Sequence, residues 1–296
     1  MRIGRILEIG VAVEKLEVAT PLYTQMLKAR PGDIVEETEH WDMRFQMCRI
    51  GNVDFELMES MVENNVIGRF VKRRGPGLHH IAFEVPDVFE AADWMKQNGV
   101  WVITDPPTLT DGLWAIFLGP KSFNGVLFEL IQGLHRWVDG RELPAELETG
   151  KEGQGFPMFQ GVTEIGIAVA DLAATSVLYE RVLGAVISET VEVDRYEVQM
   201  RVSRIGNVSL KLMQPMTMEG IIGRFIKRRG EGLHHVTLKV SDLGKAVDWL
   251  KRNGARVIDD APQTFSSNGY AFIHPSSFAG VMFQLSEKQD TWSSNR

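Results

Sequence analysis

Four residues in the N-terminal half of the chain combine ligand chemistry with a common position on predicted strands: Glu8, Glu56, His80 and Glu129. Each lies out of phase with an alternating series of apolar residues. Because successive residues of a strand face opposite sides of a sheet, all four point away from the apolar face. One imidazole and three carboxylates suit a divalent metal ion of intermediate hardness. If the strands curve around one cup, the pattern predicts a metal site. Taken singly, each glutamate is better explained as a solvated side chain on a half-exposed strand.

The elements that must position these residues follow from the hydrophobic periodicity. Alternation at period two predicts strands, and apolar residues at helical spacing predict helices. The pair Gly51-Asn52 favours a tight hairpin turn, and Gly75 favours the end of a helix. Strands are expected over 7–13, 44–50, 53–58, 80–85, 101–103, 113–118 and 126–131, and helices over 16–27, 66–74 and 88–98.

The chain contains the same unit twice. IGRFVKRRGPGLHH, from Ile67, returns as IGRFIKRRGEGLHH from Ile222, with 12 of 14 positions identical at an offset of 155 residues. The pairs RIGNVDFELM/RIGNVSLKLM and GPKSFNGVLFEL/HPSSFAGVMFQL keep that offset. A stretch rich in Gly, Pro and charge separates the copies. The sequence therefore predicts an α+β protein of four βαβββ modules, with domains at 1–133 and 159–288 and a linker at 134–158.

Three motifs resemble those of the vicinal oxygen chelate superfamily, which comprises glyoxalases, bleomycin resistance proteins and extradiol dioxygenases. They are LEIGVAV, FVKRRGPGLHHIAFEVPDV and GPKSFNGVLFEL, and within the superfamily they are most similar to the methylmalonyl-CoA epimerases. The resemblance covers both copies apart from the linker. It implies tandem domains, each a curved, cup-shaped sheet made of two modules. It also implies one metal ligand from each of four strands, at the places of Glu8, Glu56, His80 and Glu129.

The chain departs from the epimerase pattern in two places. Glu8 replaces the histidine of the first strand. The resulting Glu-Glu-His-Glu ligand set is similar to that of glyoxalase I enzymes whose first ligand is not histidine. The extra catalytic acid of the epimerases, from the strand after the first helix, aligns with His40. Strand parity places Trp41, Met43, Phe45 and Met47 on the cup side instead, so His40 reaches the cup only across a bulge.

The second copy carries different residues at the ligand places: Glu164, Lys211, His235 and Gln284. Lysine is a cation at neutral pH and repels a metal ion, and glutamine is a weaker, neutral ligand. We therefore expect one divalent metal ion per chain, among Fe, Mn, Co, Ni and Zn. The second domain is expected to lack metal, with Lys211 pairing with Glu164, and to pack against the first as an internal partner.

The resemblance and the ligand set together predict a metal-dependent enzyme. The leading hypothesis is an isomerase, epimerase or lyase that acts through an enolate-like intermediate on a small carbonyl substrate, with Glu129 and Glu8 as acid and base and His40 as a further catalytic candidate. One alternative is an Fe(II)-dependent, extradiol-type dioxygenase. The predicted ligand set disfavours a dioxygenase, because it contains a single histidine, whereas the ring-cleaving iron dioxygenases use two histidines and one carboxylate. The other alternative is a non-catalytic small-molecule binding protein of the bleomycin-resistance kind.

Composition limits the partners. The 296 residues contain 32 Lys and Arg against 39 Asp and Glu, and a net charge of -7 argues against nucleic acid. A single cysteine, Cys48, excludes an intramolecular disulfide framework. No stretch resembles a membrane span, and the N-terminus is too short and too charged for a signal peptide, so a cytoplasmic location is expected. The expected partner is a small carbonyl or aromatic molecule, and a homo-oligomer is an open alternative.

Overall fold

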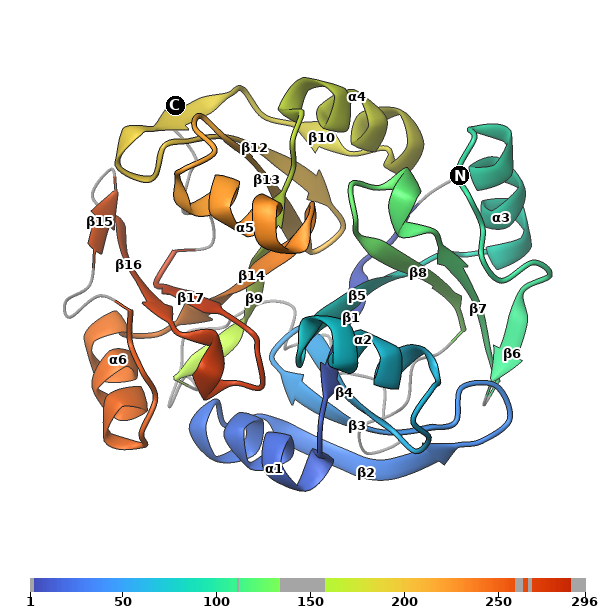
Figure 1. The fold of residues 1–296 in the computed structure, drawn as a ribbon, viewed down its shortest axis with the longest axis horizontal. Coiled ribbons are helices and arrows are strands. Elements are labelled where there is room, and N and C mark those ends of the chain that lie inside the picture. The colour runs from blue at the N-terminus through green and yellow to red at the C-terminus, as the bar shows by residue number, and fades with distance from the viewer. Residues whose placement is uncertain (1–2, 111, 134–157, 259–262, 266–267, 289–296) are drawn as a thin grey trace. The chain divides into compact units, whose positions relative to one another are not determined.

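The computed structural model describes residues 3–110, 112–133, 158–258, 263–265 and 268–288 (Figure 1). The elements of the first repeat, in chain order, are β1 (Ile6–Val13), α1 (Leu16–Pro21), a π-helical turn (Leu22–Met26), β2 (Arg30–Glu37), β3 (Met43–Ile50), β4 (Val53–Ser60), α2 (Val66–Arg74), β5 (Gly77–Glu84), α3 (Val88–Gln97), β6 (Thr108–Thr110), β7 (Leu113–Leu118), a 3-10 turn (Pro120–Ser122) and β8 (Leu127–Gln132).

The second repeat follows the same plan, except that its first helix continues without a π-helical turn and that two short strands and a 3-10 turn stand in the place of β2. Its elements are β9 (Phe159–Ala168), α4 (Leu172–Leu183), β10 (Val186–Ile187), β11 (Val191–Val193), a 3-10 turn (Asp194–Tyr196), β12 (Val198–Ile205), β13 (Val208–Pro215), α5 (Ile221–Arg229), β14 (Gly232–Val240), α6 (Leu243–Arg252), β15 (Gln263–Phe265), β16 (Asn268–Ile273), a 3-10 turn (Pro275–Ser277) and β17 (Phe283–Ser286).

Each repeat forms one mixed sheet. The first has the strand order β2-β3-β4-β1-β5-β8-β7-β6, and the second has the order β10-β12-β13-β9-β14-β17-β16-β15, with β11 beside β12. In the first sheet β1 runs parallel to β4, and β5 runs parallel to β8. The predicted α+β class, with four βαβββ modules and one curled sheet per repeat, is therefore confirmed (Figure 1).

The predicted elements differ from the observed ones mainly at the sheet edges. The strand expected over 101–103 is absent, and only an isolated bridge joins Val102 to Leu118. Strands β2 and β6 were not predicted. Both are edge strands, and most of their side chains are exposed or half-buried, so neither shows the apolar alternation that marks an inner strand.

The helix expected over 16–27 changes character at its middle. Regular α1 ends at Pro21, and residues from Leu22 to Met26 continue as a π-helical turn. Proline has no backbone N–H, and its ring crowds the preceding turn, so the regular hydrogen-bond ladder cannot continue through it. Helix α2, by contrast, spans the predicted residues and ends at Gly75, whose φ of 74° suits a residue without a side chain.

The chain divides into two compact units, and each contains parts of both repeats. So far as these ranges are described, the first unit comprises 1–7, 79–135 and 164–234, and the second comprises 8–78, 136–163 and 235–296. The predicted linker at 134–158 lies, except for its last residue, outside the described residues. The predicted domain boundaries therefore stay a prediction.

The same kind of contact joins the repeats in each unit. In the first unit Trp94 donates a hydrogen bond from Nε1 to the carbonyl of Val182 at 3.1 Å, and the buried Tyr179 ring lies edge-on to Phe123. In the second unit Trp249 donates to the carbonyl of Met26 at 2.9 Å. The expected packing of the second repeat against the first is thus present within each unit.

The predicted hairpin turn also contributes to this packing. Residues Ile50 and Val53 are the last pair of the β3–β4 ladder, so Gly51 and Asn52 form a two-residue turn. The Asn52 side chain accepts a hydrogen bond from the N–H of Val162 at 2.8 Å and donates one to its carbonyl at 3.0 Å.

No helix in the described part of the chain is long and apolar enough to cross a membrane.

Candidate metal centre

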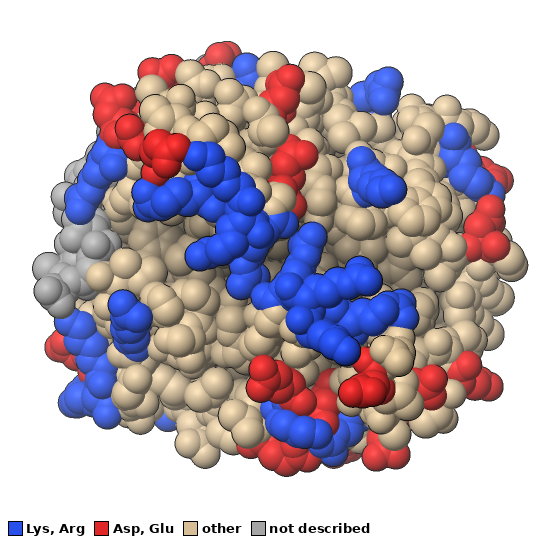
Figure 2. Space-filling view, in the orientation of Figure 1, with Lys and Arg blue, Asp and Glu red and all other residues tan. Residues whose placement is uncertain are grey.

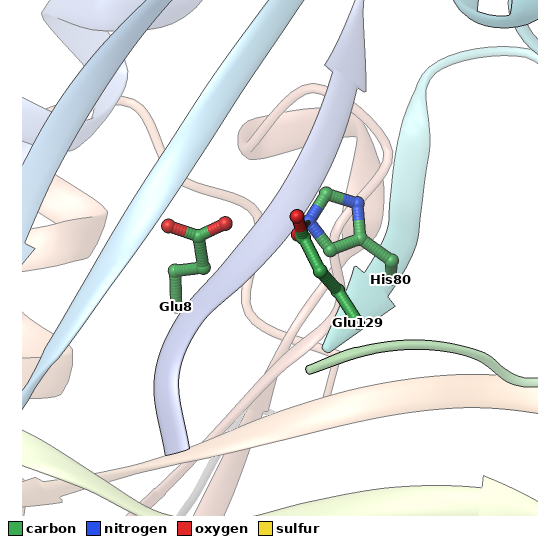
Figure 3. Close-up of side chains that lie close together, drawn as sticks. All are labelled: Glu8, His80 and Glu129. Carbon is green, nitrogen blue, oxygen red and sulfur yellow. Dashed lines mark ion pairs between the residues drawn. The ribbon is translucent and has the colours of Figure 1, made fainter. Parts of the chain in front are cut away.

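Three of the four predicted ligands lie together. Glu8 is on β1, His80 on β5 and Glu129 on β8, and these are consecutive strands of the first sheet. All three residues are buried. One ligand atom of each lies within 4.8 Å of the ligand atoms of the other two (Figure 3). We call the face of the first sheet that bears these three residues the ligand face.

The imidazole of His80 is held from several sides. Its Nε2 lies 3.3 Å from Oε2 of Glu129, and its Nδ1 lies 3.1 Å from Nδ1 of His79. The ring of Phe117 meets the imidazole edge-on, with the centroids 5.8 Å apart. The atom turned toward the Glu129 carboxylate is therefore Nε2, while a neighbour on Nδ1 fixes the ring orientation.

The group fits a divalent metal ion. A buried carboxylate is costly unless it is paired or coordinates a metal, and two such carboxylates beside one imidazole make a dense set of donors. First-row divalent ions accept imidazole nitrogen and carboxylate oxygen at about 2.0–2.2 Å. Small side-chain rotations would bring the three donors, already within 4.8 Å of one another, to a common ion. The donor set does not identify the metal.

The fourth predicted ligand, Glu56, is buried on β4, the other neighbour of β1. Its register partners are Gly10 on β1 and Met47 on β3. Its carboxylate is not part of the group within 4.8 Å, which contains only Glu8, His80 and Glu129 among the described residues. Coordination by Glu56 therefore stays a prediction.

His40 lies in the turn that follows β2 and is bound to a glutamate there. Its backbone N–H donates to Oε1 of Glu37 at 2.9 Å, and its ring Nδ1 lies 3.3 Å from the same oxygen. Glu37 also accepts from the N–H groups of Glu39 and Trp41, so this carboxylate organises the whole turn. His40 is not in the group of three, and its catalytic role stays a prediction.

Two residues near the predicted ligands were missed. Phe117 is the register partner of Glu129 on the predicted strand β7, so its contact with His80 could have been found from parity. Asp54 is the register partner of Glu8, is fully buried, and forms an ion pair with Arg49. Its charge is therefore balanced within the sheet.

The ligand face continues into an apolar cluster. Ala12, four residues beyond Glu8 on β1, packs with Phe45, Met47 and Met58, and Ile67 of α2 completes the buried group. The prediction that Phe45 and Met47 share the side of Glu8 is therefore confirmed. Met47 of this cluster is the register partner of Glu56, so the apolar group borders the place of the fourth predicted ligand.

Basic side chains gather at the end of α2 and, in the same way, at the end of α5. Lys72, Arg73 and Arg74 form the last turn of α2, and the second repeat has the same three residue types at the end of α5 (Figure 2). Cations at a helix C-terminus are stabilised by the helix dipole, which accounts for the triplet in both helices. Lys227 of α5 also pairs with Glu219.

Comparison with known proteins identifies the family. The model of the glyoxalase/bleomycin resistance protein/dioxygenase superfamily matches residues 8–117 and again residues 163–272. The chain belongs to this superfamily. The two matches correspond to the two repeats, and they include Glu8 and His80 in the first and Glu164, Lys211 and His235 in the second.

Characterised relatives of the superfamily match one repeat at a time. Over 133 residues the chain is 34% identical to the ethylmalonyl-CoA/methylmalonyl-CoA epimerase of Cereibacter sphaeroides, covering 44% of this chain and 98% of that protein. Over 128 residues it is 29% identical to the mitochondrial methylmalonyl-CoA epimerase of Bos taurus, covering 43% of this chain and 73% of that protein. The relatives are enzymes, and they support a function of the epimerase or isomerase type.

A solved structure matches the tandem arrangement as a whole. A variant of 4-hydroxymandelate synthase from Streptomyces coelicolor superimposes with a TM-score of 0.75 and 17% identity, covering 99% of this chain and 95% of that one. At this identity the likeness shows the fold of the superfamily and nothing about the reaction.

Proposed function

We propose that the chain is a metal-dependent isomerase or epimerase that removes and returns a proton at a carbon beside a carbonyl group. The observation that supports this most strongly is the buried group of Glu8, His80 and Glu129, with ligand atoms within 4.8 Å of one another. A lyase that uses the same enolate-like intermediate requires the same residues.

The metal ligands in this proposal are Glu8, His80 and Glu129, with Glu56 as the fourth, and one ion is held per chain. A divalent ion bound there would act as a Lewis acid on the carbonyl oxygen and acidify the neighbouring C–H. His80 holds its place through His79 and Phe117, and this is why we assign it a fixed ligating role.

The proton is moved by the two carboxylates. Glu129 removes it from the carbon, and Glu8 returns it, or the reverse for the opposite direction. Oε2 of Glu129 lies 3.3 Å from Nε2 of His80, and this contact positions the Glu129 carboxylate beside the imidazole. His40 is retained as a further candidate base, as the sequence suggests.

The relatives suggest the substrate class to test first. Because the relatives are named for ethylmalonyl-CoA and methylmalonyl-CoA, we propose a thioester with an acidic C–H between two carbonyl groups. The apolar cluster of Ala12, Phe45, Met47 and Met58 supports a small apolar substituent on that carbon. A cytoplasmic location is proposed from the sequence alone.

The test is solvent exchange without oxygen. Methylmalonyl-CoA and ethylmalonyl-CoA are incubated with the metal-loaded protein in D₂O under nitrogen, and deuterium at the carbon between the carbonyls is followed by mass spectrometry. The proposal predicts incorporation of one deuterium at a rate proportional to protein concentration. No exchange together with stoichiometric O₂ uptake on a catecholic substrate would replace it with the dioxygenase. Ligand binding with neither exchange nor O₂ uptake would indicate a binding protein.

A further inference from the structure

The second repeat contains a fully buried lysine in the middle of its sheet. Lys211 lies on β13 and is 1% exposed, and its Nζ lies 2.7 Å from Oε2 of Glu164 on β9. Glu164 is itself 0% exposed. Lysine is almost never buried to this extent unless it is paired, because removing the ammonium from water is costly. The pair is therefore a specific feature of this sheet, and it confirms the pairing expected from the sequence.

The strand registers show which position the lysine occupies. In the first sheet Glu56 on β4 lies opposite Gly10 on β1. In the second sheet Lys211 on β13 lies opposite Gly166 on β9. Glu8 and Glu164 likewise occupy matching places, two residues before these glycines, opposite Asp54 and Ser209. Lys211 therefore stands at the register position of Glu56, beside the counterpart of Glu8.

The charges at the two sets of positions differ accordingly. The first set consists of three carboxylates and one imidazole, which leaves an excess of negative charge for a divalent cation to balance. The second set has one carboxylate, one ammonium, one imidazole and the neutral amide of Gln284. Here the ammonium already balances the carboxylate, and Gln284 is engaged with Thr237 at 3.4 Å. The residues of the second set do not fit a metal ion.

We infer that the ε-ammonium of Lys211 is a built-in cation that takes the place of the metal in the second repeat. The charges at the second set of positions are then balanced without metal, whatever the metal concentration. The first set depends on its ion for charge balance. The duplication has separated two roles: one repeat holds an exchangeable cation for chemistry, and the other holds a covalently attached cation for structure. The comparison with the first repeat rests on the metal site proposed above.

Exchanging the two residues between the repeats tests this inference. The full chain and its variants are stripped with a chelator and titrated with Co²⁺, and the equivalents retained after dialysis are measured. We expect one equivalent in the unchanged chain, two in Lys211→Glu and none in Glu56→Lys. In the Lys211→Glu background, His235→Ala should return the count to one, which assigns the new ion to the second repeat.

Three results would overturn the inference: two equivalents in the unchanged chain, a folded Lys211→Glu variant with an unchanged count, or a Glu56→Lys variant that still binds the ion. If the unchanged chain binds no Co²⁺ but Lys211→Glu binds one equivalent that His235→Ala removes, the inference stands and the site proposed for the first repeat fails. The two proposals are thereby distinguished.

A measurement on the unchanged chain covers the case in which Lys211→Glu does not fold. Amide hydrogen exchange is recorded with Co²⁺ and with chelator. Chelation is expected to leave the protection of β9 and β13 unchanged, while exchange rises in β1, β5 and β8. A rise in β9 and β13 on chelation would contradict a built-in cation.

Discussion

Glu129 is the residue on which the proposed proton transfer depends most, because it is both a ligand candidate and a base. In Glu129→Gln the amide oxygen can still coordinate, but the side chain cannot accept a proton near neutral pH. We therefore expect turnover to fall by about 10²–10⁴-fold, the usual cost of losing a positioned acid or base. Metal binding should weaken far less than turnover falls. Steady-state rates and metal content are measured on the same preparation.

Glu56→Gln is the matched control for this variant. Glu56 is buried and on a neighbouring strand, but it lies outside the group of three, and we assign it only a holding role. The loss of turnover should be clearly smaller than in Glu129→Gln. Equal losses in both variants, or loss of metal as large as the loss of turnover in Glu129→Gln, would remove the assignment of Glu129 as proton carrier.

Neighbouring histidines test the strand register. His80→Ala should abolish metal retention, because it removes the only imidazole of the buried group. His79→Ala should retain the metal with weaker affinity, within the roughly 10–100-fold typical of losing an orienting neighbour. Metal titration of the two purified variants measures this. Equal loss in both would mean that the ligand face is assigned one residue out of phase.

At the scale of elements, the first residue of α1 donates its backbone N–H to a buried carboxylate. Glu59 on β4 accepts hydrogen bonds from Lys15 Nζ at 2.8 Å, the Leu16 N–H at 2.9 Å and Arg44 Nη2 at 2.8 Å. Burial by itself raises the pKa of Glu59, but these donors together outweigh it and hold the pKa below the usual 4.5. The ionised form is therefore the one that stabilises the start of the helix.

The pH dependence follows from the sign of this shift. A carboxyl group with a lowered folded-state pKa contributes stability above its unfolded pKa and loses it as the pH falls through the folded value. Glu59→Gln should cost about 2 kcal/mol of unfolding free energy near pH 7, typical of hydrogen bonds to a charged group. The difference from the unchanged chain should shrink below pH 4.5 in urea titrations. A difference independent of pH would contradict this account.

Inner strands could be predicted from the sequence and edge strands could not. In β1 every residue is buried, yet Glu8 and Gly10 interrupt an apolar series at period two, and this interruption placed Glu8 correctly beside His80 and Glu129. In β2 most residues are exposed or half-buried, so the pattern that marks a strand is missing. The contact of His79 with His80 was also unpredictable, because parity assigns neighbouring residues to opposite faces.

At the scale of the whole molecule, the mixed composition of the compact units was not predictable either. Local periodicity shows where strands and helices lie, but not which half of one repeat packs against which half of the other. The contacts of Trp94 with Val182 and of Trp249 with Met26 show the result. Trp94 and Trp249 occupy equivalent positions in the two repeats, and each donates a hydrogen bond to the other repeat.

Removing these indole hydrogen bonds tests their contribution. Trp94→Phe and Trp249→Phe should each cost about 1 kcal/mol, because a buried carbonyl loses its donor. In a chain of this size that lowers the melting temperature by about 2–4 °C. Trp101→Phe is the control, because Trp101 is 52% exposed, and it should have little effect. Thermal unfolding followed by circular dichroism is the measurement, and equal stability of all three variants would contradict the packing described.

The central claim is that metal held by the first repeat makes proton transfer possible. Deuterium incorporation into methylmalonyl-CoA or ethylmalonyl-CoA under nitrogen is measured for the loaded protein, the chelator-stripped protein and the stripped protein after one equivalent of divalent metal is restored. We predict that stripping abolishes exchange, that one equivalent restores it, and that His80→Ala cannot be restored. Exchange that continues at the same rate in the stripped protein, or in His80→Ala, would contradict the account.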